Sequence, residues 1–173
     1  QVQFNTPIPV AYLNAPIVDP EIVHLGYDFA LTTDYELQAS TPGGVNVVAS
    51  IGGVVIEVKD GCGPLQTSEG CGEYGNYVLV KTLINENPTT DNDTSYYLTR
   101  YAFLRKNLGV KKGDTISKIK PQDTIIGQVG NSGLSEDIHL HFEILRYVKK
   151  GQKIIKHYLQ PQNMISDLMG QGT

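Results

Sequence analysis

The sequence predicts an all-β domain with mostly antiparallel strands, arranged as a small β-sandwich or a rolled sheet with long loops. Its 173 residues include 18 Gly and 10 Tyr, a composition that favours short strands joined by turns. Runs rich in β-branched and aromatic residues recur along the chain, and turn residues such as Gly, Pro and Asn separate them. No stretch of convincing length has the helical period. Short strands without intervening helices are typical of an all-β fold.

We expect one domain, because a chain of this length can bury a substantial core. Residues 1–20, rich in Pro and Val, should form an extended N-terminal arm, and residues 21–150 the β domain. Residues 151–173 should form a C-terminal tail that packs on the domain and frays at its end. The expected strands are 45–49, 54–59, 77–81, 96–104, 124–130 and 139–146.

Charge and hydropathy exclude two classes of function. The formal net charge is −4 and the pI is near 5.5, which gives no support for a nucleic-acid surface. No apolar run approaches the ~20 residues that a transmembrane helix requires. The chain begins at Gln1 rather than Met, so we expect a processed or trimmed form that has lost an export signal.

Cys62 and Cys71 are the only cysteines, and they lie at the two ends of a loop rich in Gly. This arrangement indicates a disulfide-closed loop, whose stabilisation is typically roughly 2–4 kcal/mol. A disulfide would indicate an oxidising compartment, which suits an extracellular or periplasmic protein. The alternative is a pair of unlinked thiols.

His139 and His141 are separated by one residue in a run that we expect to be a strand. Because strand side chains alternate between faces, the two imidazoles share one face, while Leu140 and Phe142 point to the other. Two imidazoles on one face suit a metal site, in which one binds the ion and the other transfers protons. The alternative is a pair of surface histidines.

His24 and Asp28 form a second candidate pair, with Gly26 between them to let the backbone bend. Imidazole and carboxylate are both good zinc ligands, although such a pair alone is weak evidence. Together with one histidine of the later pair, they would make a His₂Asp set. Three protein ligands leave the fourth position of zinc open, as in a catalytic site, and the remaining histidine is then available as a general base.

Five motifs, in order along the chain, resemble those of the M23 metallopeptidases of the lysostaphin or LytM type. His24–Asp28 resembles H-x-G-x-D, and residues 41–55 resemble a G-T-P-V-x-A…G-x-V segment. Tyr74–Val78 resembles G-Y-G-N-x-V, Ile126–Gly133 resembles I-G-x-x-G-x-[ST]-G, and His139–Glu143 matches H-L-H-F-E. The resemblance extends over about residues 20–147.

This resemblance implies a role for each matching residue. His24, Asp28 and His141 match the ligands of one Zn²⁺ ion, and His139 matches a catalytic histidine. The implied fold is a small, mostly antiparallel β domain with the zinc in a groove walled by loops. The implied activity is hydrolysis of the peptide cross-bridges of bacterial peptidoglycan.

One departure from the family pattern concerns the second catalytic histidine, which the family carries in a Y-x-H-L strand. The equivalent run here is Tyr101-Ala102-Phe103-Leu104, so Phe103 occupies that position. Since losing one acid–base group typically costs ~10²–10⁴ in rate, two hypotheses stay open. The chain is a zinc endopeptidase with weakened activity, or it is a non-catalytic module that binds cell-wall peptide or regulates a partner hydrolase.

Overall fold

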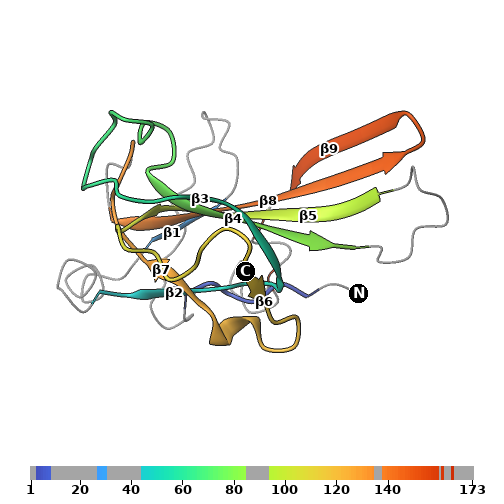
Figure 1. Ribbon diagram of the computed structural model, residues 1–173, viewed down its shortest axis with the longest axis horizontal. Coiled ribbons are helices and arrows are strands. Elements are labelled where there is room, and N and C mark those ends of the chain that lie inside the picture. Colours follow the sequence, from blue (N-terminus) through green and yellow to red (C-terminus); the bar gives the residue numbers. More distant parts are fainter. Residues whose placement is uncertain are drawn as a thin grey trace, which may run out of the picture.

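The computed structural model describes residues 3–8, 27–30, 44–84, 94–134, 138–159, 161 and 165, and for residues 27–30 the backbone alone. Within these ranges the chain forms nine strands and a short 3₁₀ turn, Pro121–Asp123 (Figure 1). The strands are β1 (Tyr27–Ala30), β2 (Asn46–Val48), β3 (Gly53–Lys59), β4 (Asn76–Leu83), β5 (Thr94–Leu104), β6 (Thr115–Ile116), β7 (Ile125–Gln128), β8 (His139–Lys150) and β9 (Lys153–Leu159).

Seven strands form one antiparallel sheet in the order β1-β8-β5-β4-β3-β6, in which β9 pairs with the second half of β8. β2 and β7 form a separate two-stranded sheet. The prediction of an all-β, mostly antiparallel fold is therefore confirmed. No helix that is long and apolar enough to cross a membrane occurs in the described ranges.

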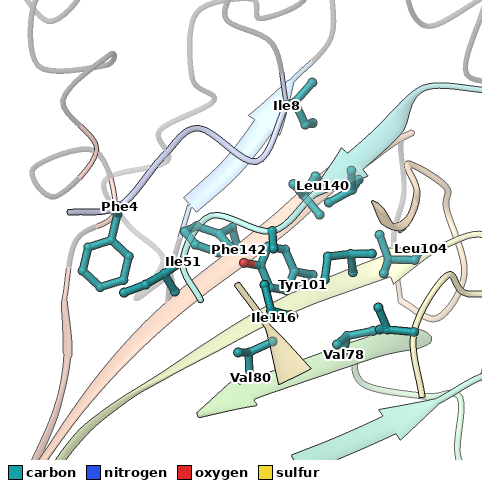
Figure 2. Close-up of a cluster of buried hydrophobic side chains, with 14 of the residues drawn as sticks. Phe4, Ile8, Ile51, Val78, Val80, Tyr101, Leu104, Ile116, Leu140 and Phe142 are labelled. Carbon is teal, nitrogen blue, oxygen red and sulfur yellow. The ribbon is translucent and has the colours of Figure 1, made fainter. Parts of the chain in front are cut away.

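The core lies against one face of the large sheet, where β5 and β8 contribute alternate residues (Figure 2). Tyr101 and Phe142 are fully buried at its centre, with ring centroids 5.1 Å apart. The hydroxyl of Tyr101 accepts a hydrogen bond of 2.7 Å from the backbone N–H of Ser50. Burial raises the pKa of Tyr101 to about 12. Phe4 and Ile8 from the N-terminal segment also pack into this core.

β8 carries core residues and candidate site residues in alternation. Leu140, Phe142 and Ile144 are buried in the core cluster. His139, His141 and Glu143 alternate with them, so they lie on the opposite face of the sheet. One face of the large sheet therefore packs against the core, and the opposite face carries the polar residues of the candidate site.

Three strands have no counterpart among those expected from the sequence: β1, β6 and β9. β1 and β6 have only four and two residues, too few for a periodic pattern to appear. β9 lies in the segment expected to form a C-terminal tail. A two-residue turn, Gly151-Gln152, returns the chain along β8, and Gly151 has the positive φ of 61° that such a turn requires.

Candidate metal and catalytic site

Strand pairing brings the two histidine-containing motifs together. β1 pairs with the start of β8, with the backbone of Asp28 opposite His141 and that of Ala30 opposite His139. On the other side of β8, Ala102 of β5 lies opposite His141. The central strand of the site is thus bordered by the first motif and by the strand that carries Phe103. His24 lies outside the described residues.

His141 is held by a buried carboxylate on its own strand. Its Nε2 atom lies 2.8 Å from Oε1 of Glu143, and both side chains are buried. An ionised carboxylate only accepts hydrogen bonds, so a neutral His141 ring bonded to one would carry its proton on Nε2 and its lone pair on Nδ1. A histidine that donates one ring N–H to a carboxylate is the usual form of a metal ligand, because the carboxylate fixes both tautomer and orientation.

Arg100 on β5 neutralises this carboxylate. Its Nε atom lies 3.2 Å from Oε2 of Glu143, and its guanidinium lies over the rings of Tyr74 and Tyr77 at 4.2 and 4.8 Å. A buried carboxylate is stable only with such a partner, and the aromatic faces add cation–π attraction. Burial, and next the Glu143 carboxylate, raise the pKa of Tyr74 above its ordinary value. The Tyr74 ring also stacks on His141, with ring centroids 6.1 Å apart. His141, Glu143, Arg100 and Tyr74 therefore form one network.

Phe103 reaches the site because β5 contains a bulge. Leu104 pairs with Asn76 and Tyr101 with Val78, so β5 has one more residue than β4 between these pairs. Phe103 adopts a φ of 60°, and its N–H donates to the Tyr74 carbonyl at 2.9 Å. Tyr101 and Leu104, the paired residues on either side of the bulge, remain in the core. The bulge therefore turns residue 103 onto the polar face, as bulges beside active sites commonly do.

The ring of Phe103 contacts both histidines. Its centroid lies 5.2 Å from the ring of His139 and 5.7 Å from the ring of His141. A bulky residue at positive φ is a rare and strained conformation. A hydrocarbon ring at this position can exclude water and pack against imidazole, but it can neither donate nor accept a proton.

His139 is the more accessible of the two histidines. It is partly exposed, and its backbone N–H donates to the carbonyl of Gly130 at 3.3 Å. This bond ties β8 to the loop that follows β7. An accessible imidazole beside a buried one fits the division of roles between proton transfer and metal binding.

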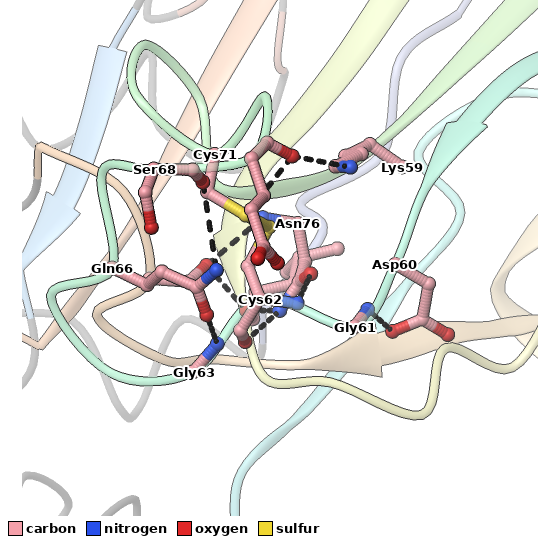
Figure 3. The surroundings of a disulfide bond; sticks show 12 residues. Lys59, Asp60, Gly61, Cys62, Gly63, Gln66, Ser68, Cys71 and Asn76 are labelled. Carbon is pink, nitrogen blue, oxygen red and sulfur yellow. Dashed lines mark hydrogen bonds between the residues drawn. A yellow bond between two sulfur atoms is a disulfide. The ribbon is translucent and has the colours of Figure 1, made fainter.

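A disulfide-closed loop is attached to the start of β4, close to the site. Cys62 and Cys71 are linked, with their Cα atoms 5.9 Å apart, and both are buried (Figure 3). The Asn76 side chain accepts from the N–H of Cys62 at 2.7 Å and donates to the carbonyls of Cys62 and Leu104, each at 2.8 Å. The loop is thereby fixed to the start of β4, two residues after Tyr74.

Ser132 fastens the next loop to the same point. Its hydroxyl accepts from the N–H of Asn76 at 2.9 Å and donates to the carbonyl of Leu104 at 2.7 Å. Gly75 allows this approach, because a Cβ atom there would lie 2.3 Å from the Ser132 hydroxyl oxygen. The segments 74–76 and 131–133 are thus hydrogen-bonded to each other beside the histidines.

The zinc ligand set itself stays a prediction. In the parts of the chain that the structure describes, no three His, Cys, Asp or Glu side chains are grouped to hold a metal. Of the expected ligands, His24 is outside those parts and Asp28 is described by its backbone alone. The residues that can be assessed do fit a zinc ion, because Glu143 is placed to orient His141 as a ligand and the backbone of Asp28 lies beside it.

A family model for Peptidase family M23 matches residues 23–156. The chain belongs to peptidase family M23. The match begins just before His24 and ends within β9, so it includes six strands of the large sheet in full and the first part of β9. No curated protein matches the chain.

Solved structures share the M23 fold. A crystal structure from Pseudomonas aeruginosa assigned to peptidase M23 has a TM-score of 0.54 and 18% identity, over 95% of this chain and 51% of that one. A zinc-containing peptidase from Vibrio cholerae has a TM-score of 0.52 and 25% identity, over 89% and 39%. A mutant catalytic domain of the prophage-encoded M23 protein EnpA from Enterococcus faecalis has a TM-score of 0.53 and 20% identity, over 92% and 95%. This M23 chain thus spans about half of the first of these proteins and less of the second.

Proposed function

We propose that this M23 domain is a zinc-dependent endopeptidase that hydrolyses peptide cross-bridges of bacterial peptidoglycan, with activity weakened by Phe103. The observation that supports this most is the buried bond between His141 Nε2 and Glu143, which would orient the imidazole to bind zinc through Nδ1. A buried, charged network contributes little to stability because of its desolvation cost, so its presence beside His141 supports a role in orienting that residue.

His24, Asp28 and His141 are the residues that would hold the zinc ion. When bound, zinc supplies a Lewis acid that polarises a peptide carbonyl and lowers the pKa of a water molecule. His139, partly exposed on the same face as His141, takes a proton from the attacking water and returns one to the leaving amine. The zinc-containing peptidase from Vibrio cholerae supports zinc as the metal.

Phe103 places a limit on this activity. It lies beside both histidines, where an imidazole could share in proton transfer, and a phenyl ring cannot replace it. The expected loss is ~10²–10⁴ in rate relative to a site with the second acid–base group. For the same reason Phe103 favours the second candidate function, a non-catalytic module that binds cell-wall peptide or regulates a partner hydrolase.

The disulfide supports an extracellular or periplasmic location, where the substrate also lies. Cys62 and Cys71 form a disulfide, and disulfides form and persist mainly in oxidising compartments.

Measurements of zinc content and of peptidoglycan hydrolysis distinguish the two candidate functions. The endopeptidase should contain close to one zinc per chain and release new amino termini from purified peptidoglycan. A chelator or His141→Ala should abolish the release, and Phe103→His should increase it. Turnover that survives both treatments would refute the mechanism. Zinc binding with no turnover by the parent or by Phe103→His would favour the binding module.

A further inference from the structure

The second half of β8 and all of β9 form a hairpin that extends from the body of the molecule (Figure 1). Seven residue pairs join the strands, from Ile144–Leu159 to Lys150–Lys153 at the turn. Every side chain from Lys153 to Tyr158 is exposed, on both faces of the hairpin. Among the described residues, β9 pairs with β8 alone, and only the base of the hairpin, at Ile144 and Leu159, takes part in the core.

The hairpin is strongly basic in an acidic chain. From Glu143 to Asp167 the sequence contains no other acidic residue, although the whole chain has a formal net charge of −4. Lys150 and Lys153 face each other beside the turn, a like-charge pair that destabilises a hairpin. The hairpin carries the positive residues Arg146, Lys149, Lys150, Lys153 and Lys156, and Lys81 of β4 lies beside it over the ring of Tyr96.

Large apolar side chains are exposed among these lysines. Ile154 is 51% exposed and Ile155 is 44% exposed, and as neighbours in a strand they point to opposite faces of the hairpin. Tyr158 is 41% exposed on the same face as Ile154. The end of the hairpin therefore presents an isoleucine on each face, with lysines beside both.

An aromatic row holds the hairpin in place. The rings of Tyr96 on β5 and Tyr147 on β8 stack at 4.5 Å. Lys81 on β4 covers the first ring at 4.5 Å, and Lys156 on β9 covers the second at 5.6 Å. This row crosses four strands on the face that also carries the histidines, so the hairpin and the site are parts of one sheet surface.

We propose that the hairpin of β8 and β9 docks the domain on an anionic lipid surface. Lysines near such a surface are attracted to its headgroups, and isoleucines on both faces would enter the interfacial layer together. A protein partner would cover one face of the hairpin or add a strand to the edge of β9, and would leave one isoleucine in water. The docking is superficial, because the edge of β9 that pairs with none of the described strands needs water or headgroups as hydrogen-bond partners. It does not depend on zinc.

The test is cosedimentation of the full chain with vesicles of phosphatidylcholine, with and without phosphatidylglycerol. We expect binding only to the anionic vesicles, weakened by salt. Lys149→Gln with Lys153→Gln should lower the partition coefficient about 25-fold, at about fivefold per lysine. Ile154→Ser with Ile155→Ser, which keeps every charge, should also lower it severalfold.

Ile119 provides a matched control, since it is 88% exposed between Lys118 and Lys120 elsewhere in the chain. Ile119→Ser should leave binding unchanged. Three results of the vesicle assay would overturn the proposal: no binding to anionic vesicles, an equal effect of Ile119→Ser, or full binding by the double serine variant. The last would indicate simple charge attraction. Sedimentation of the vesicle-free chain as a dimer, lost in the double serine variant, would assign the hairpin to contacts between copies instead.

Discussion

Glu143 is the residue whose removal tests the site most informatively, because each of its oxygens has a separate partner. Oε1 bonds to His141 and Oε2 to Arg100. Glu143→Leu removes both bonds at nearly constant volume. It frees the His141 ring to rotate and to change tautomer, and it leaves the guanidinium of Arg100 without its counter-ion in a largely buried position.

Two separate losses follow from this geometry. Removing the carboxylate behind a metal-binding histidine typically lowers metal affinity 10–100-fold, which corresponds to about 1.4–2.8 kcal/mol. Leaving the Arg100 charge unpaired should lower the free energy of unfolding by roughly 1–3 kcal/mol. Glu143→Gln keeps one carbonyl acceptor for His141 but loses the charge, so its zinc affinity should fall by about tenfold, between the parent and Glu143→Leu.

Zinc affinity is measured by competition with a chromophoric chelator, and stability by urea denaturation of the metal-free proteins, which separates the two losses. Glu57→Gln is the matched control, because the Tyr77 hydroxyl donates to Glu57 and Tyr77 also covers Arg100, while Glu57 does not contact His141. Parental zinc affinity in Glu143→Leu, or an equal loss in Glu57→Gln, would refute the orienting role.

Three further predictions follow from the same structure. Phe103→His should raise the rate of peptidoglycan hydrolysis about 100-fold or more in an assay of released amino termini, and an unchanged rate would show that the bulge does not aim this position at substrate. Replacing both Cys62 and Cys71 by Ser should lower the free energy of unfolding by roughly 2–3 kcal/mol in urea titrations, and a change near zero would contradict the structural role of the linked loop. Burial raises the pKa of Tyr101 to about 12, above its value near 10 in the unfolded chain, so its hydroxyl contributes stability that is complete below pH ~10 and is lost as pH rises toward ~12. The unfolding free energy should therefore fall more steeply over this window in the parent than in Tyr101→Phe, and parallel slopes would count against the assignment.

Alternation along strands made much of the fold and part of the site predictable. The period of two places Leu140 and Phe142 opposite His139 and His141, and the structure shows the first two in the core. The resemblance to the Y-x-H-L strand of the M23 family points to Phe103 as a site position, and its ring does contact both histidines. Alternation is local order along one strand, which a sequence displays directly, whereas the place of Phe103 follows from the family motif.

Features that depend on pairing between distant strands could not be predicted. The opposition of Arg100 to Glu143 follows from the register of β5 against β8, and no local pattern reveals a register. The bulge that turns Phe103 onto the polar face is an insertion of one residue relative to β4, visible only once both strands are aligned. Tyr74 joins the site through a loop fixed by Asn76 and Ser132 rather than through a strand.

β9 was missed for a different reason. Its alternate residues do not separate into polar and apolar faces, because each face carries both an isoleucine and a lysine. Such a strand has no burial pattern to detect, and only the turn at Gly151 indicates a hairpin. In the structure, both faces of β9 are exposed, and this exposure is the basis of the proposed docking surface.

The most direct test of the central claim is the release of new amino termini from purified peptidoglycan by the full chain, before and after removal of zinc. The account predicts slow release that stops on chelation, returns on addition of zinc and is absent in His141→Ala. Release that is equally fast in the chelated protein would contradict a zinc endopeptidase built on His141.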